Sequence, residues 1–152
     1  MSINKKKPNE NYNFFVTKGI KKATKLDFNE SKINFFNAIK INPKKHEAFI
    51  NLSNIYLIQK NFDECLNLLF DYLSKNKFNE QISNHLAKIC INYDFNHELD
   101  KLFKIIHLDD SIIEKKKQFL FFIQGQHFEN QEMYPKAINS YIKSVSCDSS
   151  FF

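Results

Sequence analysis

The chain has 152 residues, of which 43% are hydrophobic and 15% aromatic, and a net charge of +5. This length suits one domain of ordinary size. With only 2 Gly and 3 Pro the chain is a poor candidate for an all-β fold, whose tight turns need these residues. No stretch approaches the length of about 18 apolar residues that a membrane-spanning helix needs. No signal peptide is recognisable, so we expect a cytoplasmic protein.

The basic residues are all Lys, without a single Arg. Arg is the residue that contacts guanine edges and phosphates through a planar, bidentate fork. Its absence disfavours nucleic-acid binding, and we interpret the positive charge as a solvated surface. The 3 Cys are an odd number at wide spacings, which fits a reducing compartment.

The sequence repeats at a spacing of about 34 residues. One repeat position is always small and is occupied by Gly19, Ser53 and Ala87. Two others are mostly bulky: the first holds Phe15, Phe49 and Ser83, and the second holds Phe35, Leu69 and Phe103. After a slip of four residues the series resumes with Phe121, Gly125 and Tyr141. A period of this size indicates stacked helical hairpins, each too small to bury its own apolar faces.

Residues 1–10 are polar and are predicted to form a disordered leader. Apolar residues at helical spacing then predict helices over 12–25 and 28–41, the second ending before Pro43. The next hairpin is predicted at 45–59 and 62–75. The third is predicted from 79 to 92 and, after a turn at 93–96, to about 108. The last comprises one helix over 111–130, lengthened at its N-terminal end by the four extra residues, and another over 134–147.

The pattern of large and small residues in these repeats resembles that of a known repeat family. Residues 46–79 match it best, through Phe49, Leu52-Ser53, Tyr56, Phe62 and Leu69. Gly125, Phe128, Tyr134, Ala137 and Tyr141 repeat it over 118–151. The chain therefore resembles a tetratricopeptide repeat (TPR) protein. The resemblance implies an all-α, right-handed superhelical solenoid of four antiparallel hairpins over 11–152, with repeats at 12–45, 46–79, 80–113 and 118–151. We expect this array to continue, or to be followed by another domain, in a longer protein.

In the family that this chain resembles, the first helix of each hairpin lines a concave face where partners bind. The residues expected there are Ile50, Asn51, Asn54, Asn84, His85, Lys88, Phe122 and Gln126. Asn and Gln amides both donate and accept hydrogen bonds, so they can pair with the backbone of an extended peptide. Lys88 could bind a carboxylate. The competing interpretation is that Asn is common throughout the chain and is expected on any face.

The run 119–123 is apolar all the way round a helix. A helix of this kind is normally buried on every side, so core packing is the first interpretation. The second is an apolar anchor for a partner.

Sets of residues that could catalyse a reaction or hold a metal are not evident. Two Gly cannot build a phosphate-binding loop, and none of the 5 His pairs with a Cys or acid at metal-ligand spacing. We therefore predict a protein–protein interaction scaffold that is not an enzyme, has no cofactor and binds a protein or peptide. Two alternatives stay open: a recruitment module of a larger enzyme such as a glycosyltransferase or sulfotransferase, and RNA binding. Self-association through end-to-end stacking is a further expectation.

Overall fold

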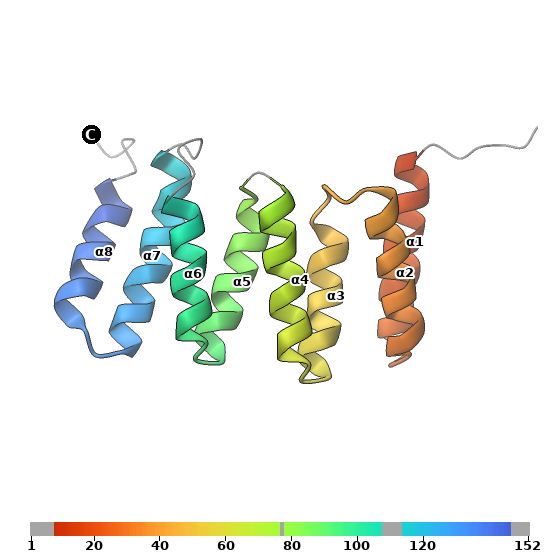
Figure 1. Ribbon diagram of the computed structural model, residues 1–152, viewed down its shortest axis with the longest axis horizontal. Coiled ribbons are helices and arrows are strands. Elements are labelled where there is room, and N and C mark those ends of the chain that lie inside the picture. Colours follow the sequence, from red (N-terminus) through yellow and green to blue (C-terminus); the bar gives the residue numbers. More distant parts are fainter. Residues whose placement is uncertain (1–7, 77, 108–113, 147–152) are drawn as a thin grey trace, which may run out of the picture. The chain divides into compact units, whose positions relative to one another are not determined.

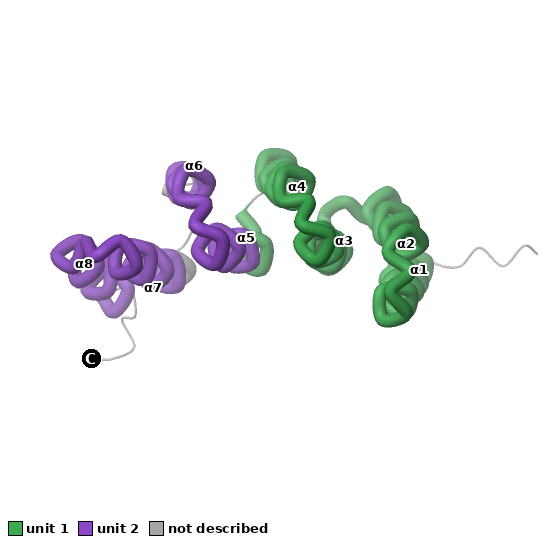
Figure 2. Tube along the Cα trace, turned by 90° about the horizontal axis from the view of Figure 1, so that it is seen from below, with its two compact units in different colours: residues 1–82 green, residues 83–152 purple. Residues whose placement is uncertain are grey.

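The computed structural model describes residues 8–76, 78–107 and 114–146, and these residues are helical apart from short turns. Their helices in chain order are α1 (Pro8–Ala23), α2 (Phe28–Ile41), α3 (Glu47–Ile58), α4 (Phe62–Lys75), α5 (Glu80–Asn92), α6 (Asn96–His107), α7 (Glu114–Asn130) and α8 (Tyr134–Ser146) (Figure 1). The chain divides into two compact units, residues 1–82 and 83–152 (Figure 2). The predicted all-α fold built from helical hairpins is confirmed.

The turn inside every hairpin has the same geometry. Each contains one residue with positive φ, namely Leu26, Lys60, Asp94 and Glu132, with φ between 58 and 60°. In the first turn the Asp27 N–H bonds to the Lys22 carbonyl at 3.0 Å. The same hydrogen bond, from an N–H to the carbonyl five residues earlier, occurs in the other three turns. It is typical of a helix that ends in a Schellman motif. The four positions lie 34, 34 and 38 residues apart, which confirms both the repeat period and the four-residue slip.

The small repeat position lies where the two helices of a hairpin approach most closely. A Cβ atom built on Gly19 would lie 2.7 Å from Cε1 of Phe35, and one built on Gly125 would collide with the ring of Tyr141. Phe35 and Tyr141 occupy the same position in their repeats. The hydroxyl of Ser31 donates to the Gly19 carbonyl at 2.9 Å in the same crossing. The close approach of the two helices therefore explains why this repeat position holds a small residue.

Within the first unit, α3 packs against the α1–α2 hairpin through two apolar clusters. One contains Tyr12, Ala38 and Ala48, and the other contains Phe35, Leu52 and Ile55. The Tyr12 hydroxyl lies between the hairpins: it accepts from the Ala48 N–H at 3.2 Å and donates to the Glu47 carboxylate at 3.1 Å. Burial and the Glu47 charge raise the pKa of Tyr12, which keeps this hydroxyl protonated.

Helix boundaries differ from the prediction mainly at the first helix. α1 begins at Pro8, so residues 8–10 belong to a helix and not to a leader; Pro is well suited to the first turn because that turn needs no N–H donor. Residues 1–7 lie outside the described part of the chain, as do residues 108–113, where the start of the lengthened helix was predicted. α2 and α4 have the predicted bounds, and α7 ends at the predicted Asn130.

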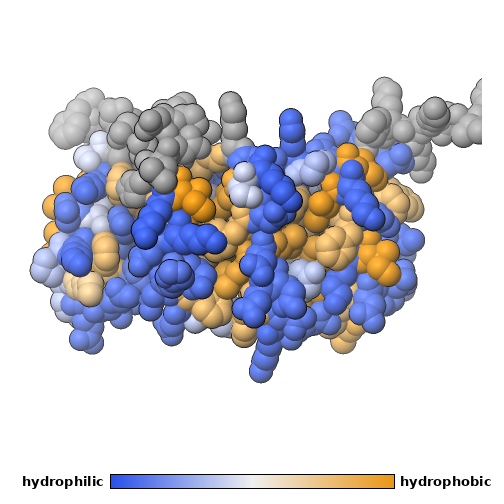
Figure 3. All heavy atoms as spheres, in the orientation of Figure 1, coloured by the Kyte–Doolittle hydropathy of each residue, from blue (hydrophilic) through white to orange (hydrophobic). Residues whose placement is uncertain are grey.

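Hydrophobic side chains reach the surface over the α1–α2 hairpin (Figure 3). In α2 the exposed ones are Ile33 and Phe36, at 53% and 42% of their possible exposure. Within the described residues no helix is long and apolar enough to cross a membrane.

Candidate functional site

The predicted binding residues of the first unit lie on α3. Ile50 is half-buried. The Asn51 amide donates to the Glu47 carbonyl one turn earlier at 2.8 Å, so part of its hydrogen-bonding capacity is used within its own helix. Asn54 is exposed. Of the two amides on this helix, Asn54 is therefore the better placed to contact another molecule.

Three further predicted residues lie on α5, in the second unit. Lys88 is exposed, whereas Asn84 and His85 are half-buried. The Asn84 side-chain oxygen is buried without a hydrogen-bond donor among the described residues, and a buried acceptor without a partner costs free energy. Burial lowers the pKa of His85, and the neighbouring Lys88 ammonium lowers it further. At neutral pH this helix thus carries a half-buried neutral imidazole and an exposed cation.

Phe122 and Gln126 lie one turn apart on α7 and are both exposed. The Phe122 ring is 45% exposed and its centroid lies 5.8 Å from that of Tyr141. Of the two interpretations of the run 119–123, burial on every side is wrong at Phe122, whose exposure agrees with its place among the predicted binding residues, whereas Leu120 and Ile123 are buried. The helix has more apolar residues than its buried face can accommodate, and Phe122 is the one left at the surface.

Neither nucleophile activation nor metal binding is indicated by the described residues. No group of three or more His, Cys, Asp and Glu among them could hold a metal ion. Cys65 and Cys90 are buried, and burial raises the pKa of the Cys65 thiol to about 11. Such a thiol is protonated at neutral pH and is a poor nucleophile.

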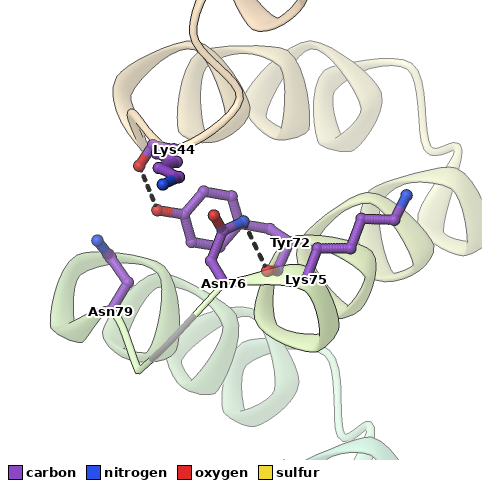
Figure 4. Close-up of a pocket in the computed structure, with 5 residues that line it drawn as sticks. All are labelled: Lys44, Tyr72, Lys75, Asn76 and Asn79. Atoms are coloured by element: carbon purple, nitrogen blue, oxygen red, sulfur yellow. Dashed lines mark hydrogen bonds between the residues drawn. The ribbon is translucent and has the colours of Figure 1, made fainter.

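One cavity, of about 420 Å³ and within the first unit, was not predicted. It is lined by Lys44, Tyr72, Lys75, Asn76 and Asn79 (Figure 4). The Tyr72 hydroxyl donates to the Lys44 carbonyl at 2.7 Å, and the Asn76 amide donates to the Tyr72 carbonyl at 3.0 Å. The Asn79 side chain caps α5 by accepting from the Ile82 N–H. These polar groups mainly make hydrogen bonds at helix ends. Sequence periodicity could not predict the contact between Lys44 and Tyr72, because the two residues are 28 positions apart.

Comparison with solved structures agrees with this architecture. The chain resembles a structure reported as a functional characterisation of Pseudomonas aeruginosa PilF, with a TM-score of 0.66 and 13% identity, over 94% of this chain and 64% of that one. It also resembles the crystal structure of MamA, with a TM-score of 0.59 and 19% identity, over 94% of this chain and 76% of that one. Both are TPR proteins. The fold is TPR-like. This chain spans less than two thirds of the PilF chain.

Comparison by sequence adds nothing to this assignment, since no family model and no curated protein matches the chain. The TPR-like helices α3, α5 and α7 each open a hairpin, and they carry all eight predicted binding residues. Their places on the helices are as predicted, and their binding role stays a prediction.

Proposed function

We propose that this TPR-like chain is a protein-interaction scaffold that binds a peptide or protein segment through the exposed side chains of α5 and α7 in the second unit. The observation that carries the proposal is the exposure of Phe122 beside Gln126 on α7. Exposed aromatic residues flanked by amides are common in protein-binding surfaces, because the ring supplies contact area and the amide supplies orientation.

Each side chain has a distinct part in this proposal. Gln126 donates to and accepts from the peptide backbone, whatever the sequence of the peptide, and Asn54 offers the same chemistry on α3 of the first unit. Lys88 pairs with a carboxylate, and Phe122 anchors an apolar side chain. The partner is thus an extended segment with at least one acidic and one apolar residue.

The test begins with affinity capture of partners, followed by calorimetric titration with the segment that is identified. Truncating an interface anchor costs more than about 1 kcal/mol, so Phe122→Ala and Lys88→Ala should each weaken binding by about tenfold. Matched controls are Phe36→Ala on α2 and Lys104→Ala on α6, which remove exposed side chains of the same types from the second helices of hairpins.

Equal affinities for the variants and the controls would contradict the proposed surface. The salt dependence of the wild-type affinity distinguishes a peptide partner from RNA. A log–log slope of several units would indicate that lysines neutralise phosphates and would favour RNA, whereas a slope near that of one ion pair supports a peptide partner.

A further inference from the structure

An apolar stripe runs along the outer face of α8. It comprises Tyr134, Ile138, Ile142 and Val145, which are 58%, 58%, 61% and 67% exposed. Their spacing places them on adjacent turns of one side of the helix, and hydrophobic side chains are visible over α8 at the left edge of Figure 3. A different side of α8 carries the buried residues Ala137, Ser140 and Ser144, and the Ser144 hydroxyl donates to the Gln118 carbonyl of α7. The stripe is therefore separate from the packing inside the hairpin.

The repeat itself does not require apolar residues at these positions. In α6 of the same unit, the positions that correspond to Tyr134, Ile138 and Ile142 carry polar residues, all of them exposed. These residues are Asn96, Asp100 and Lys104. A repeat position that faces solvent can thus be polar without loss of the fold. In α2, by contrast, Ile39 corresponds to Val145 and packs against clusters that contain residues of α3. Apolar residues at this position accompany helix–helix contact.

The stripe also carries no charge. The two cations of α8, Lys136 and Lys143, lie on the side of the helix away from the stripe. The Lys136 ammonium lies 5.6 Å from the ring centroid of Phe128, and the Lys143 ammonium lies 5.9 Å from that of Phe121. Two copies of α8 can therefore approach through the stripe without bringing like charges together.

Head-to-tail stacking on α1 of another copy is disfavoured by charge. The residues of α3 that pack on the preceding hairpin are Ala48, Leu52 and Ile55. The corresponding positions in α1 hold Phe14, Lys18 and Lys21, all exposed, with the Lys18 ammonium 6.0 Å from the Phe14 ring centroid. Docking this face on an apolar stripe would desolvate two ammonium groups without partners, which is unfavourable.

We infer that two copies of the chain pair through their α8 stripes, as antiparallel helices related by a two-fold axis. This arrangement buries an uncharged apolar surface against an identical one, as an isologous interface requires. The two-fold axis crosses the stripe midway between Ile138 and Ile142, so Ile138 of one copy faces Ile142 of the other. One stripe per copy is small compared with the total of about 1,600 Å² that stable interfaces bury. The dimer is therefore weak and depends on concentration.

Sedimentation velocity of the full chain, from about 1 to about 300 μM, tests this inference across the range of weak dissociation constants. The wild type should shift from monomer to dimer as concentration rises. Ile138→Lys and Ile142→Glu should each weaken self-association by at least about tenfold, because each places a charge in the apolar stripe. Ile33→Lys, which alters an equally exposed Ile on α2, is the matched control and should dimerise normally.

Mixing the Ile138→Lys and Ile142→Glu proteins gives the decisive measurement. In the antiparallel register the new Lys of one copy faces the new Glu of the other, so the mixture should associate more strongly than either variant alone. This recovery also shows that both variants are folded. A wild type that stays monomeric at every concentration, or a mixture of folded variants that does not associate, would overturn the inference. Peptide binding on α5 and α7 can succeed or fail independently of either result.

Discussion

Replacing Gly19 by Ala tests whether the small repeat position is set by the crossing of the helices or by chance. Ala is a better helix former than Gly by about 1 kcal/mol in a helix interior, so propensity alone predicts stabilisation. The structure predicts the opposite sign, because the added Cβ atom would lie 2.7, 2.9 and 3.0 Å from three atoms of the Phe35 ring. Ordinary carbon–carbon contacts are about 3.5–4.0 Å.

The Phe35 ring cannot move aside easily. It is 1% exposed and belongs to the cluster with Leu52 and Ile55. Overpacking of a filled core costs about 1–3 kcal/mol. After subtraction of the propensity gain, we expect Gly19→Ala to lower the free energy of unfolding by about 1 kcal/mol.

The second hairpin shows how the clash can be relieved. There Ser53 and Leu69 occupy the two repeat positions, and both are fully buried. In a Phe35→Leu background the Gly19→Ala change should therefore become stabilising by about 1 kcal/mol, the propensity value. The coupling between the two sites is then about 2 kcal/mol, within the range for residues in contact.

Urea unfolding of the wild type, both single variants and the double variant measures this coupling. Thr17→Ala at an exposed position of α1 reports a change of helix propensity without the clash. If Gly19→Ala stabilised the protein equally in both backgrounds, the crossing would not determine the residue at this position and our explanation of the repeat would be wrong.

Three further predictions concern a turn, a hydrogen bond and a buried histidine. Leu26→Gly should raise the free energy of unfolding by about 1 kcal/mol in urea titrations, because Leu26 has a φ of 60° and is 75% exposed, so that Gly relieves strain at little loss of packing. Tyr12→Phe should cost about 1–3 kcal/mol, measured in the same way, because it leaves the buried Ala48 N–H without its acceptor. His127 is buried, and burial lowers its pKa below 6.5 although Asp100 acts to raise it. Below about pH 6.5 the unfolded chain therefore binds a proton that the folded chain does not, and the free energy of unfolding falls as the pH is lowered. His127→Ile should remove this loss of stability between about pH 7.5 and 5.

Two of these predictions have a control that shares the chemistry but not the geometry. Lys25→Gly, next to the positive-φ position but not at it, should destabilise the protein. Tyr134→Phe, at an exposed Tyr, should be nearly neutral. A Leu26→Gly protein no more stable than wild type, a Tyr12→Phe protein as stable as the Tyr134 control, or an unchanged acid profile in His127→Ile would each contradict its explanation.

Much of the fold could be predicted from the sequence because the period links residues that are close along the chain. Gly19 and Phe35 are only 16 positions apart, and a hairpin joins them whatever surrounds it. The identical turns at Leu26 and Lys60 were not predicted in this form, since neither residue is the Gly that usually marks a left-handed helix end. The turn is imposed by the packing of the two helices on each other.

The candidate site was predicted less completely. Helical spacing placed Asn54 and Lys88 on helices that open hairpins, and both are exposed. It could not show that the Asn51 amide bonds back to its own helix, or that the Asn84 oxygen is buried without a donor among the described residues. These differences depend on side-chain direction and on neighbours that spacing does not specify.

The sequence by itself determined the period, the hairpins, the four-residue slip and the small repeat position, because these follow from side-chain size at recurring positions. Only the tertiary structure decided which apolar residues are covered. Ile39 packs against residues of α3, whereas Val145, at the same repeat position, is exposed. Two side chains of similar hydrophobicity differ in this way because burial depends on whether another helix lies against them.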